Sequence, residues 1–237
     1  MAIATTGATP SPSSPDGIPP LEMGDHLTRA EFERRYRAMP GLKKAELIEG
    51  VVYMPSPVSL RHGRPHLWLA TWIGNYLTQT AGLHAADNAT VRFDELNEPQ
   101  PDLLLAVEAG AGGQSRVDDE DYLAGAPEFI AEIATSSVSY DLHAKLRVYQ
   151  REGVREYLVW RTQDNEIDWF RLEEGRYVPM VRDNTGIAKS AIFPGLWLDC
   201  AALLRGDLPH VLVVLQRGID SAEHADFVAA IKKRAKP

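Results

Sequence analysis

The sequence has one cysteine, Cys200, among 237 residues. A single thiol excludes an intramolecular disulfide and any zinc or iron–sulfur site built from several cysteines, and it fits a reducing compartment. Long apolar runs are missing too. No segment approaches the ~18 consecutive apolar residues of a membrane span, and the N-terminus lacks the basic-then-apolar order of a signal peptide. We therefore expect a cytoplasmic protein with no membrane segment.

Basic residues are in deficit, because 25 lysines and arginines stand against 33 aspartates and glutamates, a net charge of −8. The excess is local: residues 94–121 contain nine acids and one base, Arg116, and the rest of the chain is neutral. A negative surface disfavours nucleic acids, whose phosphates need positive potential. Since the excess is confined to one segment, the charge neither excludes nor favours a nucleic-acid partner.

The overall composition is 44% hydrophobic and 24% charged, the balance of a globular protein and not of a disordered or fibrous one. Residues 1–25 are the exception, because five prolines lie there among serines and small residues. This composition predicts a disordered leader. Beyond it we expect one mixed α/β domain over residues 28–205, followed by a helical tail over 206–237 that is an appendage.

Apolar periodicity and turn residues predict the order of the elements. Helices are expected over 29–39, from Pro65 to 81, between Ser139 and Gly153, and over 221–236. Strands are expected as a hairpin over 45–54 and over 91–93, 102–107, 129–134, 156–160, 167–172 and 177–181. The polar, glycine-containing segment 108–127 is expected to be a mobile surface loop.

Three charged residues lie where strand pairing could bring them together. Asp102 opens the strand 102–107, Glu132 lies inside the next apolar strand, and Lys145 lies on the helix that follows. Two carboxylates supply the hard oxygen ligands that Mg²⁺ takes alongside water. A nearby lysine can hold an attacking water or balance charge that develops at a phosphate. These residues are the minimal set for a phosphodiesterase site.

Each of the three also has a purely structural interpretation. Glu132 can face solvent by alternation along its strand, although burying an acid in an apolar strand is costly unless it is paired or binds a cation. Asp102 follows Pro101, as aspartate often does in a turn at a strand entrance. Lys145 lies four residues after Asp141 and can form an exposed helical ion pair.

Short motifs follow one another along residues 28–205 in a fixed order. They are Glu46-Leu-Ile-Glu-Gly50, Pro55-Ser-Pro57 with His62, Gln100-Pro-Asp102, Glu132, Asp141, Lys145, Tyr149, Gly153, Glu156-Tyr157, Phe193-Pro-Gly195 and Leu198-Asp199. This ordered set resembles the Uma family of putative restriction endonucleases. The specificity lies in the order and spacing, since no single motif identifies the family.

The resemblance implies the restriction-endonuclease-like fold of the PD-(D/E)XK superfamily, an α/β architecture with a central mixed β-sheet flanked by helices. It also implies a DNA endonuclease that uses Mg²⁺ or Mn²⁺ and leaves 5′-phosphate and 3′-hydroxyl ends. Asp102 and Glu132 would hold the metal, with Glu46 as an accessory acid and the carbonyl of Ile133 as a further ligand.

The sequence departs from the superfamily pattern at the lysine. The position two residues after Glu132 is Ala134, and the resemblance assigns the lysine role to Lys145. This departure and the acidic segment 94–121 favour an alternative, a catalytically silent binding or interaction module with the nuclease fold. A third hypothesis is a metal-dependent hydrolase of small phosphate esters.

Four residues are expected to contact DNA: His62, Gln100, Arg147 and Arg151. His62 is expected to lie just outside the second helix, because Pro65 suits that helix's first turn. The two arginines lie on the Lys145 helix, where they can contact phosphates or form a solvated basic face. A homodimer is consistent with cutting both strands of a duplex.

Overall fold

The computed structural model describes residues 17–54, 57–135 and 137–235. The helices are α1 (Arg29–Arg37), α2 (Leu60–Thr78), the 3₁₀ turn η1 (Ala109–Ala111), the π-helix η2 (Tyr140–Lys145), α3 (Leu146–Glu152), α4 (Cys200–Leu204), α5 (Leu208–Ile219) and α6 (Ala222–Arg234). The strands are β1 (Glu46–Ile48), β2 (Val51–Tyr53), β3 (Leu83–Asp87), β4 (Val91–Arg92), β5 (Leu103–Val107), β6 (Arg116–Val117), β7 (Leu123–Ala124), β8 (Phe129–Ala134), β9 (Glu156–Arg161), β10 (Glu166–Glu173), β11 (Arg176–Pro179), β12 (Ile187–Lys189) and β13 (Trp197–Asp199). Within the described ranges, no helix combines the length and the apolarity that crossing a bilayer requires.

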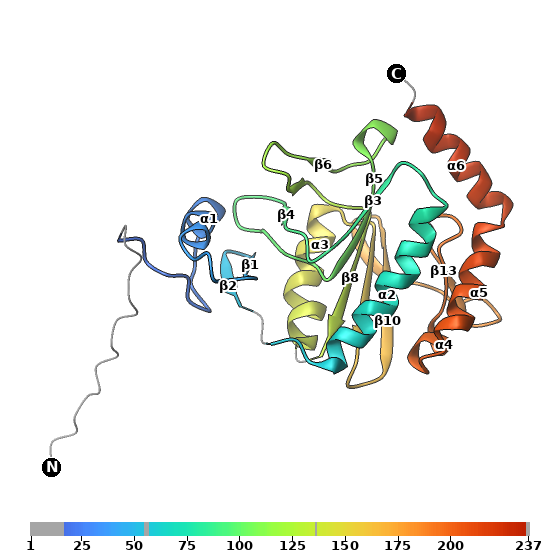
Figure 1. Cartoon of the computed structure of the whole chain (residues 1–237), viewed down its shortest axis with the longest axis horizontal. Helices are drawn as coiled ribbons and strands as arrows, with labels where there is room; N and C mark the ends of the chain where they lie inside the picture. The colour runs from blue at the N-terminus through green and yellow to red at the C-terminus, as the bar shows by residue number, and fades with distance from the viewer. Residues whose placement is uncertain (1–16, 55–56, 136, 236–237) are drawn as a thin grey trace, which may run out of the picture.

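Six strands form the central sheet, in the order β11-β10-β9-β8-β5-β3. β8 and β9 are parallel, and all other neighbours are antiparallel. A parallel pair needs a crossover connection, which η2 and α3 supply (Figure 1). The prediction of a central mixed sheet flanked by helices is confirmed.

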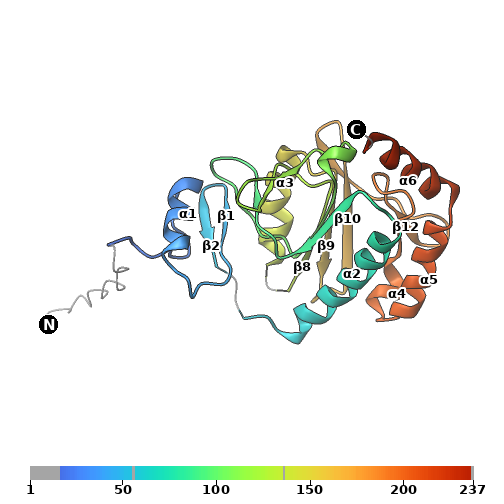
Figure 2. The same ribbon diagram turned by 45° about the horizontal axis from the view of Figure 1, so that its top comes forward.

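Helices cover both faces of the sheet, with α3 on one side and α2, α4 and α5 on the other (Figure 2). Side chains alternate along β8: Phe129 and Ile133 pack toward α2, whereas Ile130 and Ala134 pack toward α3. Glu132 shares the α3 side and is only 3% exposed. The alternation is therefore present, but it does not place Glu132 in solvent, because both faces of this strand are covered.

The start of α2 differs from the prediction. The helix begins at Leu60, five residues before Pro65, and includes His62. Proline lacks an N–H and weakens a helix interior. The buried face of α2, with Leu69, Trp72 and Tyr76, packs on the sheet and outweighs that local loss. The prediction that His62 lies outside the helix is therefore wrong.

The segment 108–127 is structured, against the prediction of a mobile loop. It contains η1, β6 and β7, and β7 pairs with β4 and β6 in a small second sheet. Leu123 is buried against β4 and β8 residues. The carboxylate of Glu128 accepts hydrogen bonds from the backbone N–H groups of Val107 (2.9 Å) and Gln114 (3.0 Å). These bonds fix the chain on both sides of residues 108–113.

The N-terminal residues form a small core of their own. Leu21, Phe32, Ala45, Leu47 and Val52 are buried together where α1 packs on the β1–β2 hairpin. Leu21 falls within the predicted leader, of which residues 1–16 lie outside the described ranges. We call residues 17–54 the N-terminal unit. The unit lies at one end of the molecule (Figure 2). Main-chain hydrogen bonds between Leu47 and Glu98 join it to the rest.

The C-terminal helices belong to the main core. Val211, Leu215 and Ile231 are buried in the same cluster as α2 and the central sheet. The backbone of α5 approaches the turn before β13 so closely that a Cβ on Gly218 would lie 2.2 Å from the carbonyl oxygen of Gly195. The predicted helices after residue 206 are present, but the expectation that they form an appendage is wrong.

Candidate active site

Two carboxylates meet at the centre of the sheet. Asp102 directly precedes β5, and Glu132 lies on the neighbouring antiparallel strand β8. The backbone N–H of Asp102 lies 3.3 Å from Oε2 of Glu132, and the N–H of Ile133 donates to Oδ2 of Asp102 at 2.8 Å. The two side chains are 4% and 3% exposed. Strand pairing therefore fixes both acids in one buried place.

Lys145 joins these strands to the N-terminal unit. It ends η2, and its Nζ lies 2.8 Å from Oε1 of Glu132 and 2.9 Å from Oε1 of Glu46 on β1. Asp141, one helical turn earlier, lies 3.9 Å away. The expected i,i+4 pair of Asp141 and Lys145 is therefore present, but it is buried and not exposed, since both residues are 2% exposed. Lys145 thus links three acids, on β1, on β8 and on its own helix η2.

Tyr149 and Gln100 support the two glutamates. The Tyr149 hydroxyl on α3 donates to Oε1 of Glu132 at 2.9 Å. The backbone N–H of Gln100 donates to Oε1 of Glu46 at 2.8 Å. The sequence pattern predicts a core position for Tyr149, because its ring continues the apolar face of α3. That pattern does not predict the hydrogen bond to Glu132.

A second group of side chains surrounds Asp102 from α2 and from the segment before β1. His62 donates from Nδ1 to the carbonyl of Ile133 (3.0 Å), which leaves its Nε2 3.4 Å from Oδ1 of Asp102. His66 donates from Nε2 to the Asp102 carbonyl at 3.0 Å. Nζ of Lys44 lies 3.7 Å from Oδ1 of Asp102. His62 and His66 lie on one face of α2 because the helix starts before both of them, contrary to the prediction for His62. Lys44 is not among the predicted site residues.

The surroundings shift the pKa values of these acids in opposite directions. Burial acts to raise the pKa of Asp102, but His62 and Lys44 outweigh it and hold this pKa well below its usual range. The contact with Asp102 raises the pKa of His62 in turn. Burial raises the pKa of Glu132 to about 8, against the opposing charge of Lys145. Asp102 is thus the acid that stays ionised, and Glu132 holds a proton more readily.

The carboxylate donors have the chemistry that a hard divalent cation prefers. Four buried carboxylates, those of Glu46, Asp102, Glu132 and Asp141, surround a single buried ammonium group, so the cluster has an excess of negative charge. Within the described ranges, however, no three His, Cys, Asp or Glu side chains are arranged so that they could together hold a metal ion. Mg²⁺ commonly binds through one or two carboxylates and completes its shell with water, which is the arrangement that these residues can offer.

The predicted DNA-contacting residues divide into two groups. His62 lies in the site, as described above. The side chain of Gln100 lies outside the site, because it is buried and donates a hydrogen bond to Thr90 at 3.0 Å. Arg147 and Arg151 lie on the exposed side of α3, where they pair with Glu49 and Glu152. The structure therefore brings together Glu46, His62, Asp102, Glu132 and Lys145, and leaves the two arginines at the surface.

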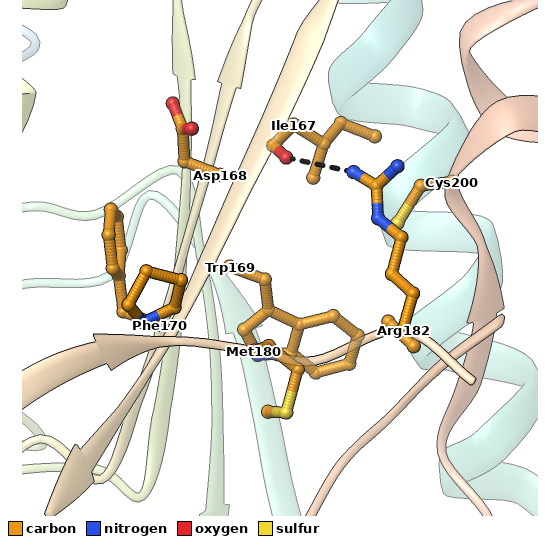
Figure 3. A pocket seen from close by; sticks show the side chains of 9 residues that line it. Ile167, Asp168, Trp169, Phe170, Met180, Arg182 and Cys200 are labelled. Carbon is orange, nitrogen blue, oxygen red and sulfur yellow. Dashed lines mark hydrogen bonds between the residues drawn. The ribbon is translucent and has the colours of Figure 1, made fainter. Parts of the chain in front are cut away.

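A separate cavity of about 230 Å³ lies toward the β10–β11 edge of the sheet (Figure 3). Ile167, Trp169, Met180, Arg182 and Cys200 contribute to its lining, and Arg182 donates to the Ile167 carbonyl at 3.4 Å. Burial raises the pKa of the Cys200 thiol to about 11, so this thiol is unreactive at neutral pH. The cavity contains none of the clustered carboxylates and is not part of the candidate site.

Comparison with known families identifies the chain's relatives. The model of the Uma2 family, described as putative restriction endonucleases, matches residues 29–201. The chain belongs to the Uma2 family. This match contains every residue of the carboxylate cluster, and the resemblance predicted from the ordered motifs is confirmed. The Pro55-Ser56 part of those motifs lies outside the described residues.

Solved structures support the fold of this Uma2 chain. A crystal structure of a putative nuclease belonging to DUF820, from Anabaena variabilis ATCC 29413, matches with a TM-score of 0.52 at 13% sequence identity. The match covers 75% of this chain and 99% of the other. At this identity the likeness concerns the fold, which is nuclease-like. No curated protein matches significantly.

Proposed function

We propose that the chain is a DNA endonuclease that depends on Mg²⁺ or Mn²⁺ and leaves 5′-phosphate and 3′-hydroxyl ends. One observation carries the proposal. Two buried carboxylates, Asp102 just before β5 and Glu132 on the neighbouring strand β8, are linked by hydrogen bonds, and a lysine lies 2.8 Å from Glu132. Membership of a family of putative restriction endonucleases supports the same reaction class.

Asp102 and Glu132 would hold the metal, with Glu46 and the Ile133 carbonyl as further oxygen donors. When bound, such an ion polarises a phosphate and lowers the pKa of a coordinated water. Asp102 is suited to the role because its pKa is held low and it stays ionised. Tyr149 and the backbone N–H of Gln100 fix the glutamates in place.

Lys145 would take the role that the superfamily gives to a lysine on the strand itself. Position 134 is alanine, and the ammonium group reaches Glu132 from the crossover helix instead. Burial opposes its charge, but Glu132 and Glu46 outweigh burial and raise the pKa of Lys145 well above its usual value. Lys145 therefore stays cationic, orients both glutamates and balances their charge when a phosphate approaches.

The test is cleavage of supercoiled plasmid in Mg²⁺, Mn²⁺ or chelator. We compare wild type with three site variants, Asp102→Asn, Glu132→Gln and Lys145→Met. The control is Glu95→Gln, at an exposed acid of the acidic segment 94–121 that also contains Asp102. We expect metal-dependent nicking that falls more than about 100-fold in the three site variants, since residues that only support a metal ligand already cost 10–100-fold. Glu95→Gln should cleave like wild type.

The contrary outcomes are distinct. A folded wild type that does not cleave in either metal would support the silent interaction module, which the engagement of Lys145 by Glu46 and Glu132 also favours. Turnover of a chromogenic phosphodiester without cleavage of DNA would support the small-ester hydrolase. Cleavage that all three variants retain would point to a contaminating nuclease.

A further inference from the structure

Lys44 gives the site a second lysine with a different environment from Lys145. Its side chain is 21% exposed, against 3% for Lys145. Its Nζ donates to Oδ1 of Asn88 at 2.9 Å and lies 3.7 Å from Oδ1 of Asp102. Lys44 therefore lies beside the buried Asp102 and, unlike Lys145, reaches solvent.

Lys145 is poorly placed to contact a substrate. Its ammonium group is held by Glu132 and Glu46 at 2.8 and 2.9 Å, and the ring of Tyr140 lies 5.1 Å away. Reaching an external phosphate would require breaking two buried ion pairs, which leaves uncompensated charge in a low-dielectric region. A cationic side chain closer to the surface is better placed for contact with a substrate than Lys145.

Lys44 retains hydrogen-bonding capacity. An ammonium group has three N–H donors, and among the described residues Asn88 takes one of them at hydrogen-bonding distance. The 3.7 Å separation from Asp102 is longer than a hydrogen bond and amounts to an electrostatic contact. Two donors therefore remain for an incoming anion.

Asn88 fixes the position of Lys44 relative to Asp102. It follows β3 in the left-handed region, with φ of 49°, and its own N–H donates to the Asp102 carbonyl at 3.2 Å. Asn88 thus binds Asp102 through its main chain and Lys44 through its side chain. Lys43 provides a natural comparison, since it is the adjacent lysine and is exposed.

We propose that Lys44 binds a phosphate oxygen of the nucleic-acid substrate at the entrance to the carboxylate cluster, with Asn88 as its positioning residue. The proposal rests on the proposed nuclease function. A lysine is a compact point charge that suits a single phosphate oxygen, and its position beside Asp102 offsets the repulsion between the acids and the phosphate.

The experiment measures KM, kcat and the salt dependence of binding for a short DNA duplex. We expect Lys44→Met to raise KM about 10- to 100-fold, the range for a hydrogen bond to a charged group, with a smaller change in kcat. The slope of log K against log salt should fall by about one, as for the loss of one phosphate contact. A merely structural role for Lys44 would not change this slope.

Three variants complete the design. Lys44→Arg keeps the charge and should restore most of the affinity, whereas Lys43→Met should match wild type. Asn88→Gly keeps access to positive φ but removes the acceptor that holds Lys44, so KM should rise by less than in Lys44→Met. Thermal unfolding of each variant checks the fold, and Asn88→Gly tests the proposal independently if Lys44→Met is unstable.

The possible failures are separable. If wild type cleaves DNA and Lys44→Met keeps both its KM and its salt slope, the Lys44 proposal is wrong and the nuclease function stands. If wild type neither binds nor cleaves DNA, the nuclease function is wrong and the Lys44 proposal fails with it.

Discussion

Glu156 shows how a buried acid can serve structure alone. Its carboxylate accepts hydrogen bonds from the Ser190 hydroxyl (2.8 Å) and from the N–H groups of Ala191 (2.7 Å) and Ile192 (3.3 Å). These contacts fasten the start of β9 to the turn that precedes β13. Burial nevertheless raises the pKa of Glu156 to about 7. Hydrogen bonding therefore satisfies the oxygens without fully restoring the ionised form.

The raised pKa of Glu156 makes stability depend on pH. Between about 4.5 and 7 the folded protein binds a proton that the unfolded chain has released, so the free energy of unfolding falls as the pH rises. Across this pH range the titration of Glu156 lowers the free energy of unfolding by roughly 3 kcal/mol, at 1.4 kcal/mol per pKa unit. We expect Glu156→Gln to flatten this decline in urea unfolding from pH 5 to 8, because it removes the titrating carboxyl. The variant should also be less stable at every pH, because the Ser190 hydroxyl already accepts from the N–H groups of Ile192 and Phe193 and cannot accept from the new amide as well. A decline as steep as in wild type would contradict the assignment, and Glu95→Gln is the exposed control.

At the residue scale, the sequence identified the acids better than their partners. Glu132 was predictable because an acid inside an apolar strand requires a compensating group, and Asp102 because it opens a neighbouring apolar strand. Lys44 and Tyr149 were not, since their contacts join elements that are distant in sequence. The one available signal for Lys44 was its position two residues before Glu46, the spacing that puts side chains on the same side of an extended chain.

Element packing sets a sharp requirement at α5. Gly218 allows the helix to touch the carbonyl of Gly195 and the ring of Trp197, and an added Cβ would lie 2.2 and 2.8 Å from them. The closer of these contacts is to the backbone, so relief requires moving the helix. Glycine is therefore needed at this position for packing, although it weakens a helix intrinsically.

We expect Gly218→Ala to lower the free energy of unfolding by at least about 1–3 kcal/mol through overpacking. Gly74→Ala is the matched control, since Gly74 lies in α2 without a positive φ, and a Cβ added there would have no atom within 4 Å. This control should gain about 0.5–1 kcal/mol from helix propensity. Urea unfolding of both variants provides the measurement, and equal effects at the two positions would refute the packing argument.

Elements were predictable where a local apolar pattern and tertiary packing agree. The β1–β2 hairpin, β8 and the β9–β11 meander lie where the sequence predicts them. The start of α2 and the segment 108–127 were missed because distant contacts decide them: packing of Leu69 and Trp72 in the first case, and the Glu128 carboxylate in the second. Neither contact can be predicted from the residues that are nearby in the sequence.

For the molecule as a whole, excess carboxylate charge should make the folded state respond to divalent cations. A ligand that binds the native state alone stabilises it, by about 2.7 kcal/mol at 100 times its Kd. For a chain of this length that corresponds to a rise in Tm of roughly 5–10 °C. We expect Mg²⁺ or Mn²⁺ to raise the Tm of wild type and of Glu95→Gln, but not that of Asp102→Asn. A rise that persists in Asp102→Asn would place the bound cation elsewhere.

The separate small core of the N-terminal unit has a consequence for amide exchange and for catalysis. Glu46 and Lys44 lie on a unit whose buried apolar cluster is far smaller than those flanking the central sheet. Cooperative units with few apolar contacts open at lower free energy than the whole protein. Amides of Leu47 and Val52 should therefore exchange before those of Ile130 and Ala131. Some molecules can thus lose the position of Lys44 and Glu46 at the candidate site while their central sheet remains folded. Inactivation by heat or denaturant should therefore precede global unfolding.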